Sequence, residues 1–368
     1  MKSKSELRVA IIGGGIGGAA AAVALRREGI RADLYEQAPV IKEVGAGVGM
    51  RPSTVYFFEN WGIYEELKSK SLESNWMQVV TADGHVIVNE KWPLLTDNPD
   101  ETWARLIHRA DLIETFLNQL PPDSIHLSHR LEKIIDHGNH AEIHFENGHS
   151  IEADLVIGAD GIRSSIRSQL FSDKGPIYSG THAYRAVVNN KEAFDLVPDD
   201  TFKVFVDGST QIYVLPLHHR KEVSFDVTLQ SEDSAWRPIV EKKDILKHLA
   251  NFDSNIRKTA KSVEVYTCRS IYDIDPIDRW HSNCITLLGD AAHAMQHHLG
   301  QGANMAIQDA GVLAECLSEA GSISEALQNY QAIRKPITDR YQELSRMAPT
   351  QDAEPAFLEK DQANQLNG

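Results

Sequence analysis

The chain has 368 residues and a formal net charge of −15 at pH 7, from 37 Lys and Arg against 52 Asp and Glu. This length allows two domains or one large composite domain. The acidic excess argues against a nucleic-acid partner, because phosphate binding requires clustered Lys and Arg. The three cysteines, Cys268, Cys284 and Cys316, show no CxxC or Cys/His spacing, so we expect free thiols and no metal site.

The first residues are polar and run directly into an apolar strand pattern, without the apolar core and cleavage site of a signal peptide. No apolar stretch approaches the length of a membrane span. We therefore expect a cytoplasmic protein without a membrane partner, as a monomer or homodimer.

The N-terminal region reads as one βαβ unit. Residues 7–12 predict a buried parallel strand, 13–29 a glycine-rich turn and an alanine-rich helix, and 30–35 a second strand. Helical patterns follow at 53–69 and 109–119.

Strand patterns dominate the middle of the chain. Residues 125–157 predict short strands with Asn-Gly turns, and 181–228 predict a sheet with one covered face. After 244 helical and loop segments return, followed by the strand CITLLGD and a long helical pattern. This order predicts a cofactor domain interrupted by a β-sheet substrate domain. The expected cofactor domain is 1–70, 105–175 and 276–348, the substrate domain 71–104 and 176–275, and the polar tail 349–368.

A glycine-rich turn follows the first predicted strand. Gly13, Gly15 and Gly18 form GxGxxG before a helix, and Glu36 ends the next strand. Such glycines let the backbone approach a pyrophosphate at the helix N-terminus, and the carboxylate accepts hydrogen bonds from ribose hydroxyls. Glu36 would repel a 2′-phosphate, so the turn favours FAD or NAD over NADP and leaves the choice between those two open.

Two further motifs follow strand patterns. GADGIRSSIR begins at Gly158, and LLGDAAHAMQHHLGQGANMAIQDAGVL begins at Leu287. With the first turn, in this order and separation, the sequence resembles the aromatic-ring flavoprotein monooxygenases, a single-component family that includes salicylate, 3-hydroxybenzoate, 6-hydroxynicotinate and urate hydroxylases. The resemblance extends to about residue 340. It implies an α/β fold with a Rossmann-like FAD-binding domain and an interleaved β-sheet substrate domain.

The resemblance also implies which residues contact FAD. Glu36 matches the family's ligand of the adenosine ribose. Arg109 matches the family's arginine that lies over the FAD phosphates and ribitol. Asp160 belongs to the DG motif that touches FAD and the nicotinamide nucleotide, and Asp290 matches the ribitol ligand. In the family, a turn and the start of the following helix face the flavin pyrimidine ring. The residues of this chain that match them are Gly300, Gln301, Gly302, Ala303 and Asn304.

The charge of reduced flavin gives a physical reason for this arrangement. A helix N-terminus is a partly positive site that stabilises negative charge near N1 and O2. The small residues Gly45, Ala46 and Gly47 would let backbone pass close to another side of the ring. Asp160 and Asp290 have a plainer interpretation as helix caps.

The chain departs from the family beside the flavin. Where many relatives carry a proline, this chain has His297, followed by His298. An imidazole at His298 would bind or deprotonate a phenol or hydroxypyridine. The alternative is a structural histidine packed under the loop.

The predicted substrate sheet offers further candidates. Because alternate strand residues share a face, Gln211, Tyr213 and Leu215 lie together. If that face covers the flavin, Gln211 and Tyr213 are substrate ligands. The alternative is a set of cross-strand surface pairs. We expect His218 and His219, in a turn-like segment, to be solvated.

The resemblance implies a reaction. NADH or NADPH reduces FAD, O2 adds at flavin C4a to give a hydroperoxide, and its distal oxygen passes to a small electron-rich aromatic or N-heteroaromatic acid. Overall similarity favours heteroaromatic acids such as hydroxynicotinate. Another FAD- or NAD-dependent oxidoreductase, such as a dehydrogenase or halogenase, and a non-catalytic nucleotide-binding regulator remain alternatives. A halogenase would carry WxWxIP, and a plain dehydrogenase would leave the GD and DG motifs unexplained.

Overall fold

The computed structural model describes residues 4–41, 46–92 and 104–347. These residues form two compact units, the first from 4–41, 113–177 and 272–347 and the second from 46–92, 104–112 and 178–271. The division into cofactor and substrate domains stays a prediction, because compactness does not reveal what a unit binds. The predicted tail at 349–368 and Gly45 lie outside the described residues. No described helix is long and apolar enough to cross a bilayer.

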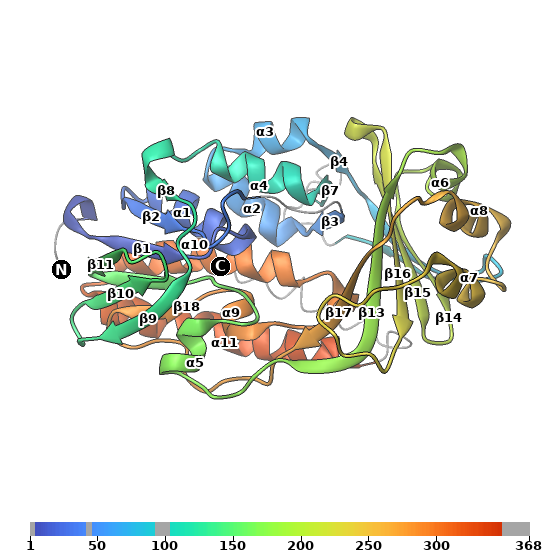
Figure 1. Cartoon of the computed structure of the whole chain (residues 1–368). Coiled ribbons are helices and arrows are strands. Elements are labelled where there is room, and N and C mark those ends of the chain that lie inside the picture. The colour runs from blue at the N-terminus through green and yellow to red at the C-terminus, as the bar shows by residue number, and fades with distance from the viewer. Residues whose placement is uncertain (1–3, 42–45, 93–103, 348–368) are drawn as a thin grey trace. The chain divides into compact units, whose positions relative to one another are not determined.

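The first unit is built on a five-stranded sheet of order β18-β12-β1-β2-β8. Strands β1, β2, β8 and β18 are labelled in Figure 1. All neighbouring strands in this sheet are parallel. Its strands are β1 (Val9–Ile12), β2 (Ala32–Tyr35), β8 (Ile125–His126), β12 (Leu155–Gly158) and β18 (Ile285–Leu287). A three-stranded antiparallel sheet in this unit contains β9 (Leu131–Asp136), β10 (Ala141–Phe145) and β11 (Ser150–Ala153). The expected α/β class with a Rossmann-like parallel sheet is confirmed.

Helices of the first unit carry the motifs described above. They are η1 (Lys4–Glu6), α1 (Ile16–Arg27), η2 (Pro122–Ser124), α5 (Ser165–Leu170), α9 (Asp290–His293), η4 (His297–Leu299), α10 (Gly302–Glu319) and α11 (Ile323–Ser345). Helix α1 packs on α10, and the small residues of α1 permit this close approach. A Cβ at Gly17 would lie 2.8 Å from Leu288 Cδ2 and 3.3 Å from Ala306 Cβ on α10, so glycine allows close packing there.

The second unit contains a seven-stranded sheet of order β17-β13-β16-β15-β14-β5-β6. Its strands are β5 (Trp76–Thr81), β6 (Val86–Lys91), β13 (Ile177–Val188), β14 (Phe202–Asp207), β15 (Thr210–Leu217), β16 (Glu222–Gln230) and β17 (Thr267–Asp273). A smaller sheet is formed by β3 (Gly47–Met50), β7 (Arg105–His108) and β4 (Ser71–Glu73). The other elements are α2 (Pro52–Asn60), α3 (Tyr64–Ser69), α4 (Arg109–Leu117), α6 (Lys191–Leu196), η3 (His218–Arg220), α7 (Lys242–His248) and α8 (Ser254–Ser262).

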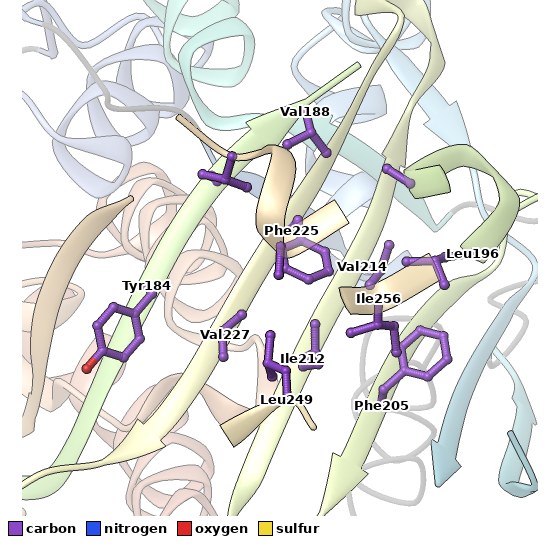
Figure 2. Packing of buried hydrophobic residues seen from close by; sticks show 14 of the residues in the cluster. Tyr184, Val188, Leu196, Phe205, Ile212, Val214, Phe225, Val227, Leu249 and Ile256 are labelled. Atoms are coloured by element: carbon purple, nitrogen blue, oxygen red, sulfur yellow. The ribbon is translucent and has the colours of Figure 1, made fainter. Parts of the chain in front are cut away.

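One face of the large sheet forms an apolar core with helices α6, α7 and α8. Figure 2 shows Ile212, Val214 and Phe225 from the strands beside Leu249 and Ile256 from the helical segment. All five side chains are buried. Because strand residues alternate in direction, the neighbours of these residues face the other side of the sheet.

The structure divides one predicted helical stretch. The pattern at 53–69 forms two helices, α2 and α3, because Gly62 between them adopts φ +64°. A left-handed residue cannot continue an α-helix, and glycine adopts that conformation at little cost. The prediction of helix was right for most of these residues and wrong about its continuity.

Candidate cofactor and substrate sites

Three motif turns meet at one edge of the parallel sheet. The turn starting at Gly13 follows β1, the one at Asp160 follows β12, and the one at Gly289 follows β18. These three strands are neighbours in the sheet. Ligands of open parallel sheets bind outside the carboxyl ends of the strands. The first unit therefore brings the three motifs together where such a ligand binds.

Gly13 and Gly18 of the first turn each have a structural reason. Gly13 has φ +112°, and a Cβ there would overlap the backbone of Ala159. A Cβ at Gly18 would overlap the carbonyl oxygen of Gly13. Nothing lies within 4 Å of the Cβ position of Gly15, which precedes α1. The helix N-terminus thus has open space at the point where a pyrophosphate would bind.

Glu36 is held at the end of β2 by two backbone amides. Its Oε2 accepts from Gly14 N at 2.7 Å, and its Oε1 accepts from Ala38 N at 2.8 Å. Each carboxylate oxygen can accept a further hydrogen bond. The carboxylate is therefore fixed beside the glycine turn and still able to receive ribose hydroxyls.

Asp160 both caps a helix and retains an acceptor. Its Oδ2 accepts from Ser165 N at 2.8 Å at the start of α5. Its Oδ1 is buried and has no hydrogen-bond partner. Burial raises the pKa of this carboxyl, and hydrogen bonds from Ser164 and backbone amides oppose that rise. An unpartnered buried acceptor is costly unless a ligand donates to it.

Sequence reasoning did not assign a role to Arg167 in the same motif. Its buried guanidinium donates to Ala291 O at 2.8 Å and also to Ile162 O. It thereby joins the DG segment to the helix that follows the GD turn. Its place in GADGIRSSIR was a usable signal, because a buried arginine on a short helix requires acceptors from elsewhere.

The GD turn and the GQG turn lie side by side. Gly289 has φ +61°, and Asp290, which is exposed, opens α9. The Cβ position of Gly302, the first residue of α10, lies 3.8 Å from Asp290 Oδ1. Gly300 has φ +64°, and its carbonyl accepts from Asn304 Nδ2 at 3.0 Å.

The first turn of α10 holds no acidic residue. Gln301 is its N-cap residue, Gly302 and Ala303 follow in the helix, and no side chain caps it. The positive end of the helix dipole is therefore not neutralised by a side chain of that turn. Such an end stabilises an anionic ring edge.

A buried ionic group supports the GD turn from below. Asp309 on α10 accepts from Gly289 N at 3.0 Å, contacts His293 Nε2 at 2.5 Å, and accepts from Arg334 Nε at 2.7 Å. The Asp309 side chain is 0% exposed. Burial acts to raise the pKa of Asp309, but His293 and Arg334 lower it below its ordinary value. Sequence reasoning missed this group.

His298 is fixed by a chain of hydrogen bonds. Asp273 Oδ2 accepts from Gln296 Nε2 at 3.0 Å, so the amide oxygen of Gln296 faces His298 Nε2, 2.9 Å away. Because that oxygen only accepts, Nε2 carries the proton. His298 Nδ1 is buried without a partner. Burial lowers the pKa of His298, which keeps the imidazole neutral at neutral pH.

In the second unit, Gln211 and Tyr213 share a face of β15 as predicted. The Tyr213 hydroxyl donates to Gln211 Oε1. Tyr213 and Leu215 pack with Leu106 and Val204 in an apolar cluster on that face. Burial raises the pKa of Tyr213 far above its ordinary value, so the phenol stays protonated.

The short segment Ala46–Gly47 is bound to two of the other candidate elements. Ala46 O accepts from Arg109 N at 3.0 Å, at the start of α4. Gly47 N donates to Ser224 Oγ at 2.8 Å on β16. A Cβ at Gly47 would lie 3.1 Å from Ser224 Cβ, closer than ordinary contact. Glycine thus lets this segment lie against the sheet.

The residue His219 is exposed, as predicted, and its imidazole also has a side-chain partner. Its Nε2 lies 2.8 Å from Asp111 Oδ2, and the side chain alone is 16% exposed. Arg220 Nη1 donates to Asp111 Oδ1 at 2.8 Å. Asp111, in the first turn of α4, pairs with both residues, and a sequence pattern could not reveal these pairings. His218 pairs with Asp200 and stays more exposed.

The residues of the first unit fit FAD. The open helix start at Gly15, the fixed Glu36 carboxylate and the unpartnered Asp160 Oδ1 offer donors and acceptors for pyrophosphate and ribose. Asp290 and the α10 N-terminus add sites for ribitol and an anionic ring edge. Within the described ranges, no cluster of three or more His, Cys, Asp or Glu residues could hold a metal ion.

Comparisons with known proteins agree with this fit. A family model described as FAD binding domain matches residues 6–345. The 6-hydroxynicotinate 3-monooxygenase of Pseudomonas fluorescens is 31% identical, over 92% of this chain and 90% of its own. The salicylate hydroxylase of Pseudomonas putida is 29% identical, over 93% and 85%. The structure of Klebsiella pneumoniae HpxO with FAD and uric acid has the same fold, with TM-score 0.84 and 23% identity over 99% of this chain and 91% of that one.

Proposed function

The chain belongs to the family whose model is described as FAD binding domain, and we propose that it is an FAD-dependent monooxygenase. The proposed substrate, which the enzyme hydroxylates, is a small electron-rich aromatic or N-heteroaromatic acid. NADH or NADPH is the co-substrate, and O2 supplies the oxygen. The family resemblance inferred from the three motifs is confirmed. The similarity to a 6-hydroxynicotinate 3-monooxygenase supports N-heteroaromatic acids as the first class to test.

The observation that carries the proposal is the meeting of three motif turns at neighbouring strand ends, with a buried Asp160 oxygen left without a donor. When bound, FAD supplies the redox chemistry, taking a hydride from the nicotinamide and passing oxygen from O2 to the ring. The protein supplies position, exclusion of water and electrostatics.

The proposed cofactor ligands follow from the contacts described. Glu36 accepts from the adenosine ribose, and Asp160 Oδ1 accepts from the cofactor. Asp290 binds the ribitol. Arg109, beside Ala46 and Gly47, neutralises phosphate. The segment from Gly300 to Asn304 presents helix amides to the pyrimidine edge, where a fixed positive potential stabilises reduced flavin.

The proposed ring ligands are Gln211, Tyr213 and His298. Tyr213 and Gln211 form a joined pair on one sheet face. His298 Nε2 donates a hydrogen bond to Gln296 Oε1, and its Nδ1 is buried. This geometry favours His298 as a neutral group that binds the ring over one that takes a proton from it. The oligomeric state, monomer or homodimer, and the cytoplasmic location of the enzyme stay predictions.

The test is the visible spectrum of the purified protein, followed by NADH and NADPH oxidation with hydroxybenzoates and hydroxypyridine acids. We expect a flavin spectrum, and oxidation that one ring compound stimulates with formation of hydroxylated product. A colourless protein that FAD cannot reconstitute would contradict the proposal. A flavin-bound protein that hydroxylates no member of the panel would contradict the substrate class alone.

A further inference from the structure

A carboxylate with no role so far lies on the same sheet face as Gln211 and Tyr213. Asp226 is in the middle of β16, opposite Tyr213 on β15 and opposite Arg185 on β13. Paired residues on adjacent strands point to the same side of a sheet. The Asp226 side chain is 15% exposed. The other side of this sheet is the apolar core.

The surroundings of Asp226 compensate its charge only in part. Ser224 Oγ donates to its Oδ1 at 3.3 Å, the backbone amide of Ala186 also donates to the carboxylate, and the Arg185 Nε lies 4.0 Å from its Oδ2. Arg109 adds a favourable charge from further away. Removing a carboxylate from water is costly unless close hydrogen-bonded partners replace the solvent. An incompletely compensated buried carboxylate is typical of a functional site.

Asp226 is connected to the segment that the family resemblance assigns to the flavin. Ser224 lies between them: it accepts from Gly47 N at 2.8 Å and donates to Asp226. Arg109, another residue assigned to FAD, binds the carbonyl of Ala46 next to Gly47. The carboxylate thus lies two hydrogen bonds from backbone proposed to pass the flavin ring.

The other candidates are poor proton acceptors. Tyr213 stays protonated, and its hydroxyl already donates to Gln211. His298 has one nitrogen bound to Gln296 and the other buried. Asp226 is a carboxylate with free acceptor capacity on the sheet face that carries Gln211 and Tyr213.

We propose that Asp226 is the catalytic residue that accepts the proton of the substrate's ring hydroxyl. The substrate O–H bond breaks, the proton moves to a carboxylate oxygen, and the electron pair stays on the ring oxygen. That oxyanion makes the ring electron-rich, and the proton passes to water when product leaves. This inference rests on the proposed function.

Electrostatics supports the assignment. Burial raises the pKa of Asp226 to about 6, with Arg185 and Ser224 opposing the rise. A base with a pKa just below the working pH is ionised and still able to take a proton. The charged groups around it are the guanidinium groups of Arg185 and Arg109, and Tyr213 opposite stays protonated because burial raises its pKa. Asp226 is the group among them whose raised pKa lies near neutral pH.

The experiment compares the wild type with Asp226→Asn and Asp226→Glu, using 6-hydroxynicotinate and salicylate as probes. The control is Asp207→Asn, a carboxylate at the end of β14 that pairs with Asn251. For the probe that the wild type hydroxylates, kcat/KM is measured from about pH 5 to about pH 9. An ultraviolet difference spectrum reports whether the bound probe is ionised.

We expect an acidic limb near pH 6 in the wild type, the control and Asp226→Glu. Asp226→Asn should lose that limb, lower kcat/KM by about 100-fold or more, and bind the probe un-ionised. Its flavin spectrum and FAD affinity should stay those of the wild type. A retained limb, a loss under about threefold, or loss of FAD by both Asp226 variants would overturn the inference. If the wild type hydroxylates neither probe, the proposed substrate class is contradicted. The role of Asp226 is then tested by comparing the ionisation of the bound probe in the wild type and the two Asp226 variants.

Discussion

Replacing Asp309 by Asn should break the hydrogen bonds that join the GD turn to helices α9, α10 and α11. Asp309 receives Gly289 N, His293 and Arg334 with its two carboxylate oxygens, and the side chain is fully buried. An asparagine has one accepting oxygen and an NH2 group that only donates. Either orientation of the amide leaves Arg334 Nε, or both Gly289 N and His293 Nε2, without their acceptor.

The expected loss of stability is large. Removing one partner of a buried ionic group costs about 3–5 kcal/mol, because the remaining charge is buried without compensation. The matched control is Glu343→Gln on α11, whose ion pair with Arg340 is exposed. Exposed ion pairs contribute about 0–1 kcal/mol. The measurement is urea unfolding of the FAD-free proteins.

The same variant should weaken FAD binding, since Gly289 precedes the proposed ribitol ligand Asp290. We expect the FAD dissociation constant to rise about tenfold or more, equivalent to about 1.4 kcal/mol. Flavin fluorescence quenching measures it at a temperature where both variants are folded. A stability loss below about 1 kcal/mol would refute the burial argument. Unchanged FAD affinity in a clearly destabilised variant would refute the link to the cofactor.

Three further predictions follow from single side chains. Asp226→Asn should stabilise the fold at about pH 8, since the rise of its pKa from 3.8 to about 6 corresponds to about 3 kcal/mol as an upper limit. The ionised form is disfavoured in the folded protein, so this gain should shrink as pH falls through about 6 and vanish below about 3.8 in urea titrations. Gly18→Ala should abolish FAD retention on gel filtration, because its Cβ would overlap Gly13 O, whereas Gly175→Ala at an exposed position with open space should retain FAD. Asp290→Ala should lose FAD affinity with little change in unfolding free energy, and unchanged FAD retention would count against its assignment as a ligand.

The sequence was most informative where backbone geometry requires particular residues. A turn that needs a positive φ or close backbone contact admits glycine and little else, so Gly13 and Gly289 could be recognised from the chain alone. The parallel sheet followed from the same logic, because each motif turn comes after an apolar strand pattern.

Contacts between side chains that are distant in sequence could not be predicted from the sequence. The Asp309 group joins residues from three helices, and nothing in their spacing names the partners. Asp226 appears in its strand as one polar residue among several, and its importance depends on its register against Tyr213 and Arg185. The pairing of His219 was missed for the same reason, since its partner Asp111 lies 108 residues away in sequence.

The central claim, that this FAD-binding chain hydroxylates a small aromatic acid, is tested most directly with isotopic oxygen. The purified enzyme is incubated with NADH or NADPH, 6-hydroxynicotinate or salicylate, and 18O2, and the product is analysed by mass spectrometry. We expect one 18O atom per product ring. Oxidation of the nicotinamide that yields only hydrogen peroxide with every ring compound tested, or oxygen derived from water, would contradict this claim.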